Sequence, residues 1–323
     1  MNALRSICTA LACGSLLAAP LASLAQSSGK PLRIIVPFAP GGGQDILARS
    51  FNTELGAALG QPVIVEYRAG GGGGVGTAYV AKAEPDGLTL SMSAASHIIS
   101  AVLTSKPAYH PIRDFTAVAH VGTGSQILII NSQLPAKSVA EFVKYAKANP
   151  GKLNYGSAGS GSSTHLAMAY FTNAAGLDIV HIPYKSNADQ TTELLSGRIQ
   201  AVMIPSISAM AFAKDSRLTL LAVTPSARSL FFPNLPTVAE SGYPGFNYGS
   251  WFGLLGPAGI PRPATERINT EMNKLLKVPL IAERLAKIGI EPLALTPQQF
   301  EKLLVEDLQR IERIVKLSGA HSD

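Results

Sequence analysis

Apolar runs of strand length alternate along this chain with segments whose apolar positions recur at helical spacing. Because strands that alternate with helices form βαβ units, the pattern predicts an α/β fold with a mostly parallel sheet. A second series of the same kind begins near Ile127, so we expect two α/β sheets in succession. The expected elements of the first series are 32–38, 46–59, 63–67, 75–83 and 88–93, and those of the second are 127–131, 139–148, 153–155, 166–175, 179–182, 191–195, 199–204 and 218–223.

The C-terminal part of the chain is predicted to be helical. Leu304, Leu308 and Ile311 lie at helical spacing along its last segment, and we expect this tail to return to the first domain. The length of the chain suggests two domains, with crossings between them near 122–130 and 249–255. The predicted divisions are 1–25 for a leader, 26–127 plus 253–323 for domain 1 and 128–252 for domain 2, with tail helices at 263–276, 280–288 and 297–317.

The first 25 residues have the pattern of a secretory signal peptide. A short head with one cation precedes an apolar stretch, and the small residues Ser23 and Ala25 are placed as a cleavage site. Cys8 and Cys13 are the only cysteines and lie inside this segment, so a chain cleaved near Ala25 has no thiol. This excludes disulfides, thiolate metal ligands and cysteine nucleophiles, and the signal peptide predicts that the mature protein is exported.

Charge and motifs argue against several classes of protein. The chain has 27 basic and 21 acidic residues, an excess that suits small anions but is too scattered for a nucleic-acid-binding stripe. The sequence contains no G-x-S-x-G elbow, no Walker phosphate loop and no histidine pair at i and i+4, so we expect no metal and no cofactor. Residues 71–76 match G-x-G-x-x-G, but the next strand, at 88–93, ends without an acidic residue. A nucleotide-dependent or other secreted enzyme is therefore only an alternative.

Two glycine-rich turns, 37–45 and 156–165, each join an apolar strand to a helix. In open α/β sheets ligands bind beyond the carboxyl ends of the strands, where such turns lie. Backbone N–H groups at a helix N-terminus are unpaired and attract negative charge. The two turns are therefore predicted to be the two halves of one anion clamp.

Several side chains near these turns are candidates for ligand contact. Phe38 lies between two prolines and is predicted to form a pocket wall, whereas Asp45 is expected to stabilise the start of its helix. His165 and His97 each have two interpretations, as a donor to a carboxylate or as an inward-packed residue. Ser93, Ser96 and His97 are the candidate donors for a second carboxylate, so we expect an aliphatic or aromatic dicarboxylate as ligand.

Five motifs in a fixed order resemble the Bug family, the substrate-binding proteins associated with tripartite tricarboxylate transporters. The resemblance runs from about Lys30 to the C-terminus. One departure is the segment 67–72, which has Ala69 where the family pattern has proline and Gly71 where it has alanine, so the identity of a relative's ligand does not transfer directly. The motifs are Pro37-Phe38-Ala39-Pro40-Gly41-Gly42 with Asp45, Gly156-Ser157-Ala158-Gly159 with His165-Leu166, His181-Ile182-Pro183-Tyr184-Lys185, Pro236-Thr237-Val238-Ala239-Glu240-Ser241-Gly242 and Gly256-Pro257-Ala258-Gly259.

The resemblance implies a two-domain periplasmic-binding-protein fold of the Venus-flytrap, type II-like class, with a ligand cleft between the lobes. It implies a protein that closes around a small carboxylate and is not an enzyme. The expected partners are the ligand and the membrane permease subunits of a tripartite tricarboxylate transporter, and we expect a monomer. A receptor that hands the same ligand to a signalling system is the alternative.

The resemblance also assigns ligand contacts by position. Asp189 follows the loop that faces the cleft in the family, where it either meets a cationic ligand group or begins the next helix. The remaining contacts are Phe38, Gly41 and Gly42 on one lobe and Ser157, Ala158, Gly159, Thr164 and His165 on the other.

Overall fold

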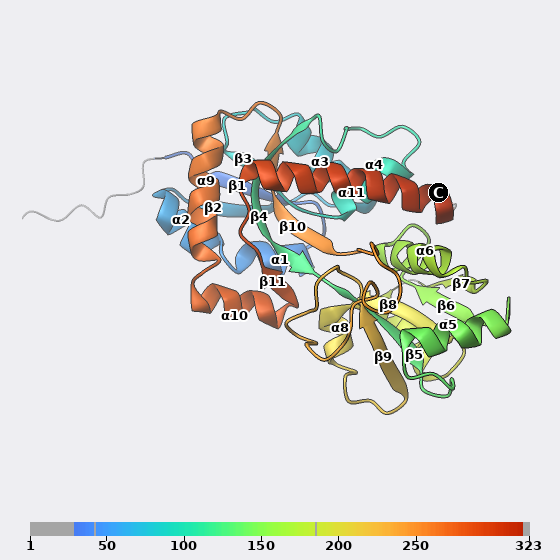
Figure 1. The fold of residues 1–323 in the computed structure, drawn as a ribbon. Coiled ribbons are helices and arrows are strands. Elements are labelled where there is room, and N and C mark those ends of the chain that lie inside the picture. The colour runs from blue at the N-terminus through green and yellow to red at the C-terminus, as the bar shows by residue number, and fades with distance from the viewer. Residues whose placement is uncertain (1–28, 42, 185, 319–323) are drawn as a thin grey trace, which may run out of the picture.

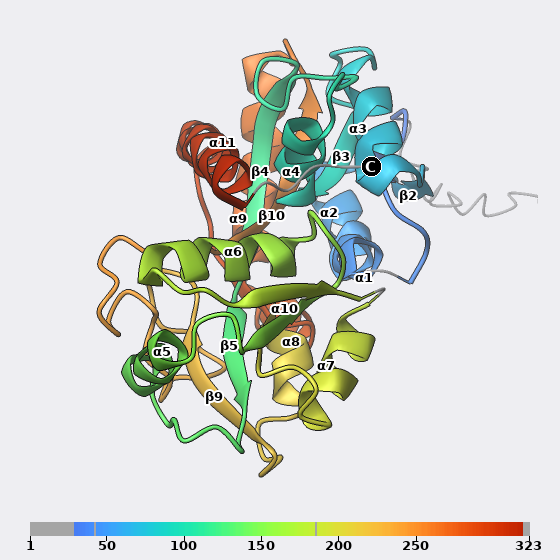
Figure 2. The same cartoon turned by 90° about the vertical axis from the view of Figure 1, so that its right-hand side faces the viewer.

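The computed structural model describes residues 29–41, 43–184 and 186–318, and the predicted leader 1–25 lies outside them. The described chain forms two lobes, each built on its own β-sheet with helices packed against it (Figure 1, Figure 2). The prediction of two successive α/β sheets is therefore confirmed. Within these ranges no helix is both long enough and apolar enough to span a lipid bilayer.

The first sheet has six strands in the order β11-β4-β10-β3-β1-β2. β1 is parallel to β2 and β3, whereas β10 is antiparallel to both β3 and β4, and β11 is antiparallel to β4. β1 is almost wholly apolar and buried, which is typical of a strand covered on both faces. The strands are β1 (Leu32–Val36), β2 (Val63–Tyr67), β3 (Thr89–Ala94), β4 (Phe115–Gly124), β10 (Ser250–Pro257) and β11 (Ile290–Pro292).

The second sheet has five strands in the order β7-β6-β8-β5-β9. β6 is parallel to β7 and β8, but β5 is antiparallel to β8 and β9. Most strands of each sheet run in one direction, β1 to β4 in the first sheet and β6 to β9 in the second, as the prediction of a mostly parallel sheet requires. The exceptions that the pattern did not predict are β10 and β11 in the first sheet and β5 in the second; β5 and β10 are the strands by which the chain enters the other sheet. The strands are β5 (Gln126–Asn131), β6 (Asn154–Ser157), β7 (Val180–Pro183), β8 (Ala201–Pro205) and β9 (Leu218–Val223).

The helices follow the strands of each lobe, and η1 is a single 3₁₀ turn. The first lobe contains α1 (Gly43–Arg49), α2 (Asn52–Leu59), η1 (Gly71–Gly73), α3 (Gly74–Ala81), α4 (Ser96–Leu103), α9 (Arg262–Leu275), α10 (Pro279–Lys287) and α11 (Pro297–Ser318). The second lobe contains α5 (Val139–Ala148), α6 (Ser163–Ala175), α7 (Asn187–Leu195) and α8 (Ser206–Met210).

The chain passes between the two sheets twice. β4 continues into β5 through Ser125 alone, and the segment after β9 returns to the first sheet as β10. Gln126 and Ile127 thus belong to the second sheet, and Ser250 belongs to the first. We propose that the domain boundaries lie at Ser125 and Gly249 rather than after 127 and 252.

The largest apolar cluster is shared by both lobes. It joins Ile98 on α4 and Trp251 on β10 to Phe171 on α6, and Phe300 and Ile311 on α11 complete it. α11 lies along β4 and α4 and also packs on α6 (Figure 1). The tail therefore returns to the first lobe as expected, and it contacts the second lobe as well. Each buried side chain of this size contributes about 1.5–3 kcal/mol.

Candidate functional site

The first glycine turn joins β1 to α1, and the Asp45 side chain accepts hydrogen bonds that hold this turn together. The Asp45 carboxylate is buried and accepts hydrogen bonds from Gly41 N–H (2.8 Å), Arg49 Nε (2.7 Å) and Tyr67 OH (2.8 Å). Burial acts to raise the pKa of Asp45, but the hydrogen bonds from Gly41, Tyr67 and Arg49 outweigh it and hold that pKa below its usual value. An ionised Asp45 therefore keeps the turn in one conformation.

Gly41 faces open space in this turn. Its φ of +83° lies in the left-handed region that favours glycine, and a Cβ placed on it would meet no atom within 4 Å. Its N–H group is already paired with Asp45, so a bound anion would need other donors. Gly42 lies outside the described residues. The contacts predicted for Gly41 and Gly42 remain predictions.

Phe38 is half-buried and packs against the glycine-rich segment around η1. A Cβ on Gly73 would lie 3.0 Å from Phe38 Cζ, and Gly73 has a φ of +96°. Only glycine combines this close approach with this backbone conformation. The chain therefore runs directly beside Phe38 at Gly73, just after the segment 67–72 that departs from the family pattern.

The second glycine turn joins β6 to α6, and its polar side chains bond back to the turn. Thr164 Oγ1 accepts from Ala158 N–H (2.9 Å), Ser157 Oγ accepts from Gly159 N–H (3.2 Å), and His165 Nδ1 accepts from Gly161 N–H (3.0 Å). These bonds give the serine, threonine and histidine a structural role in the turn. From the sequence alone this role could not be distinguished from direct contact with a ligand. They hold the N-terminal end of α6 in place before any ligand arrives.

Three aromatic rings stack beneath this turn. His165 and His181 lie nearly parallel with ring centres 3.9 Å apart, and the ring centre of Tyr155 lies 4.9 Å from that of His181 and 6.4 Å from that of His165. His181 Nε2 is 2.7 Å from Ser157 Oγ. The sequence assigns no role to His181, although it lies in one of the family motifs. Its contacts exist only in the folded protein, because β7, which contains His181, pairs with β6.

Both stacked histidines are neutral near pH 7. Burial lowers the pKa of His165, and burial together with the neighbouring His165 lowers that of His181 to about 4. Since His165 Nδ1 accepts a hydrogen bond, a neutral ring carries its proton on Nε2. His165 can therefore donate one hydrogen bond without adding a full charge to the turn.

Two members of the second donor set expected at the end of β3, Ser93 and His97, are buried in this structure. His97 is buried in an aromatic cluster, with its ring centre 4.5 Å from that of Phe115 and its Nε2 2.7 Å from the Pro111 carbonyl oxygen. Burial lowers its pKa to about 4. Ser93 is also buried, and its hydroxyl has no partner among the described residues. The inward-packed interpretation of His97 is the one that the structure has.

Asp189 lies at the exposed start of α7. Ser186 Oγ donates to the Asp189 carboxylate at 2.9 Å and accepts from Asp189 N–H at 3.2 Å, an arrangement that caps a helix. Of the two interpretations of Asp189, the structure therefore has the one in which it begins the next helix.

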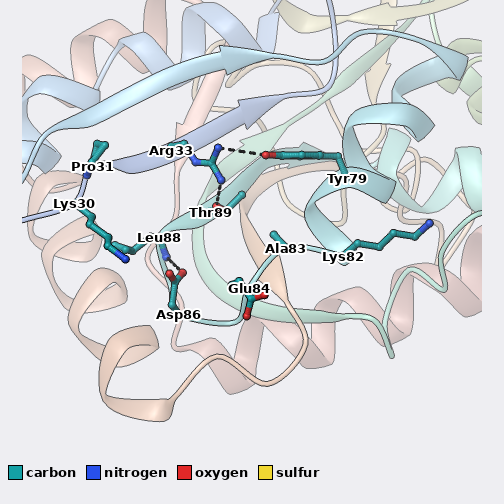
Figure 3. A pocket seen from close by; sticks show the side chains of 10 residues that line it. All are labelled: Lys30, Pro31, Arg33, Tyr79, Lys82, Ala83, Glu84, Asp86, Leu88 and Thr89. Atoms are coloured by element: carbon teal, nitrogen blue, oxygen red, sulfur yellow. Dashed lines mark hydrogen bonds between the residues drawn. The ribbon is translucent and has the colours of Figure 1, made fainter.

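A pocket of about 650 Å³ lies in the first lobe but far from both turns (Figure 3). Arg33 at the start of β1 donates there to Thr89 Oγ1 (2.8 Å) and to Tyr79 OH (3.2 Å). Arg33 and Thr89 stand at the amino ends of β1 and β3, whereas the glycine turns follow the carboxyl ends of β1 and β6. In the described ranges no three His, Cys, Asp or Glu side chains are grouped to hold a metal ion.

The two turns lie on the same side of the molecule. Figure 2 shows α1 and the loop that leads into α6 on the right-hand side, between the two sheets. Each turn is held by its own side chains, Asp45 in one and Thr164 and His165 in the other. The arrangement offers helix N-termini from both lobes, a neutral histidine donor and an aromatic wall, which together suit a small anion with an apolar part.

Comparison with known proteins points in the same direction. Residues 47–320 match the model of the tripartite tricarboxylate transporter family receptor. Protein BugT of Bordetella pertussis is 33% identical over 293 residues, which cover 90% of each chain. Among solved structures, Rpa4515 of R. palustris with adipate is 30% identical with a TM-score of 0.74, covering 90% of this chain and 98% of that one. MatC from Rhodopseudomonas palustris with bound malate is 29% identical with a TM-score of 0.70, covering 88% and 98%.

These likenesses extend over nearly the whole chain and agree with the two-lobe architecture. The chain belongs to the tripartite tricarboxylate transporter receptor family, the Bug-type periplasmic solute-binding proteins.

Proposed function

We propose that this protein captures a small dicarboxylate in the periplasm and delivers it to the permease subunits of a tripartite tricarboxylate transporter. The observation that carries the proposal is the second glycine turn, where the N-terminus of α6 is preorganised by Thr164 and His165. Charge-assisted hydrogen bonds from such fixed donors contribute about 1.5–3 kcal/mol each. A few of them offset the desolvation of one carboxylate without a cation in contact.

The first turn supplies the opposing lobe of the site. Open space beside Gly41 admits a ligand oxygen, and Phe38 provides an apolar surface for a carbon chain or ring. The relatives with adipate and with malate support a dicarboxylate as the class of ligand. Ser93, His97 and Asp189 are left out of this site because their side chains are engaged elsewhere or buried.

We propose that the protein is a monomer that binds its ligand without chemically changing it. Its family consists of solute-binding proteins, and neither glycine turn places a nucleophile beside an activated base that a substrate can reach. Ser157 and His181 are within hydrogen-bond distance, but the Ser157 side chain is completely buried. Export through the inner membrane and cleavage near Ala25 complete the proposal.

A thermal-shift screen of mono-, di- and tricarboxylates tests this function. A ligand at a hundred times its dissociation constant stabilises the protein by about 2.7 kcal/mol, which raises the midpoint of a chain of this size by several degrees. We expect a dicarboxylate such as adipate or malate to give the largest shift. If no carboxylate shifts the midpoint, or if mass spectrometry detects a product after incubation, the proposal is wrong.

A further inference from the structure

The two interlobe crossings meet at one buried residue, Thr224. Gln126 begins β5 immediately after the first crossing, and Tyr248 precedes β10 on the second. Gln126 N–H donates to Thr224 Oγ1 (3.0 Å), Thr224 N–H donates to the Gln126 carbonyl (3.0 Å), and Tyr248 N–H donates to the Thr224 carbonyl (2.9 Å). The backbones of both crossings are thereby joined where the chain enters and leaves the second lobe.

The side chains of the same two residues end on the first residue of α6. Gln126 Nε2 donates to Ser163 Oγ at 2.8 Å, and Tyr248 OH donates to the Ser163 carbonyl oxygen at 3.0 Å. Gln126 and Tyr248 are 4% and 3% exposed, so water does not replace a lost bond easily. Ser163 follows the cap residue of the second glycine turn, so both crossings hold the helix start that binds the anion in the proposed function.

α11 fastens the second crossing from the other side. Arg310 donates to the carbonyl oxygens on either side of Tyr248, from Nη1 to Asn247 (3.0 Å) and from Nη2 to Gly249 (3.4 Å). Its guanidinium group also lies 5.7 Å from the centre of the Tyr248 ring. A pocket of about 680 Å³ lined by Asn247, Gly249 and Arg310 leaves room beside this segment. The Tyr248 segment is thus held at both ends but not packed on all sides.

We propose that Tyr248 and Gln126 are positioning residues that couple the anion-binding start of α6 to both interlobe crossings. Lobe closure changes the backbone angles at Ser125 and Gly249, which are the residues next to Gln126 and Tyr248 along the chain. Because both side chains end on Ser163, the start of α6 adopts the geometry that suits a carboxylate only in one relative orientation of the lobes. A carboxylate that binds there stabilises that orientation. The inference rests on the proposed function for its ligand.

Two hydroxyl deletions test the coupling. Tyr248→Phe removes the bond to Ser163 and keeps the ring. Tyr109→Phe is the matched control, because Tyr109 is also a buried tyrosine that donates to a backbone carbonyl, that of His97 at 2.8 Å, but lies away from the crossings. Gln126→Met tests the other crossing with a side chain of similar size that cannot donate a hydrogen bond.

The orientation of the lobes is measured with a pair of spin labels. Cys8 and Cys13 are the only cysteines, so a C8S/C13S chain accepts labels at introduced cysteines alone. Thr270→Cys on α9 and Lys144→Cys on α5 are exposed helical positions on the two lobes. Distance distributions are recorded without ligand and with adipate, and adipate affinity is measured by calorimetry.

We expect Tyr248→Phe and Gln126→Met to broaden the ligand-free distance distribution and to weaken adipate binding about tenfold, while Tyr109→Phe changes neither. A purely structural role predicts that Tyr248→Phe and Tyr109→Phe behave alike. Unchanged ligand-free distributions in Tyr248→Phe and Gln126→Met would overturn the inference. If the wild-type protein binds neither adipate nor another carboxylate, the proposed function fails, while the ligand-free distances still decide whether these residues fix the lobe orientation.

Discussion

Asp45→Asn is the most direct test of how the first glycine turn is held. Asparagine has the same shape, but it has only one acceptor oxygen. Its NH₂ group, itself a donor, would face donors that in the wild-type protein bind the second carboxylate oxygen. A hydrogen bond to a charged group contributes about 1.5–3 kcal/mol, and Asp45 is buried where it accepts from Gly41 N–H and Tyr67 OH. The third partner, Arg49, is 54% exposed, so its ion pair is screened and adds little.

We therefore expect Asp45→Asn to lower the free energy of unfolding by about 2–3 kcal/mol, since the Gly41 and Tyr67 bonds are lost in part. Urea denaturation measures this loss. If the turn forms part of the site, calorimetry should also show at least about tenfold weaker binding of adipate or malate. Arg49→Met is the control, because it removes the exposed partner together with its hydrogen bonds to Tyr67 OH and leaves the Gly41 and Tyr67 bonds to Asp45 available. A variant Asp45→Asn that is as stable as Arg49→Met and binds as tightly as wild type would refute this account of the turn.

Three further predictions follow from particular residues. Burial lowers the pKa of His97 to about 4, so the stability contributed by the neutral His97 side chain is complete above about pH 6.5 and is lost as the pH falls toward 4. Between these pH values the denaturation midpoint should fall less steeply with decreasing pH in His97→Leu than in the wild type. An identical slope would contradict the lowered pKa of His97. Trp251→Phe removes the Nε1–H donor that lies 2.7 Å from buried Asp307, which should lower the free energy of unfolding in urea by about 1–3 kcal/mol. Adding Asp307→Asn should restore part of this loss, and no restoration would contradict the contact between Trp251 and Asp307. Gly42→Val should abolish carboxylate binding in calorimetry while leaving the fold intact by circular dichroism, and retained affinity would remove this position from the site.

The hydrogen bonds at the second turn show why sequence alone does not reveal whether a polar residue contacts the ligand or stabilises the turn. Thr164 and His165 were selected from the sequence because hydroxyl and imidazole groups can donate to a carboxylate. In the structure both accept from backbone N–H groups of their own turn. Their effect on a ligand then comes largely through the turn they fix, and for His165 also through the proton on Nε2.

Local pattern was sufficient for much of the fold. The apolar run of β1, the glycine turns and the helical spacing of α11 depend on neighbours in the sequence, and their predicted positions agree with the structure within a few residues. The order of the motifs likewise indicated the family, because motif spacing is a property of the chain itself. The placement of Asp45 at a helix start was also readable, since a capping pattern is local.

Tertiary structure alone decided what depends on distant segments. Strand direction in both sheets follows from the two crossings, and no alternation of apolar runs contains that information. His97 is a core residue because Phe115 and the Pro111 carbonyl surround it, whereas His165 stacks on His181 because β7 pairs with β6. The sequence by itself determined where the two turns lie and to which family the chain belongs. The fold determined which side chains close those turns, and it brought Gln126 and Tyr248 to Ser163, because such contacts exist only once segments far apart in the chain have packed together.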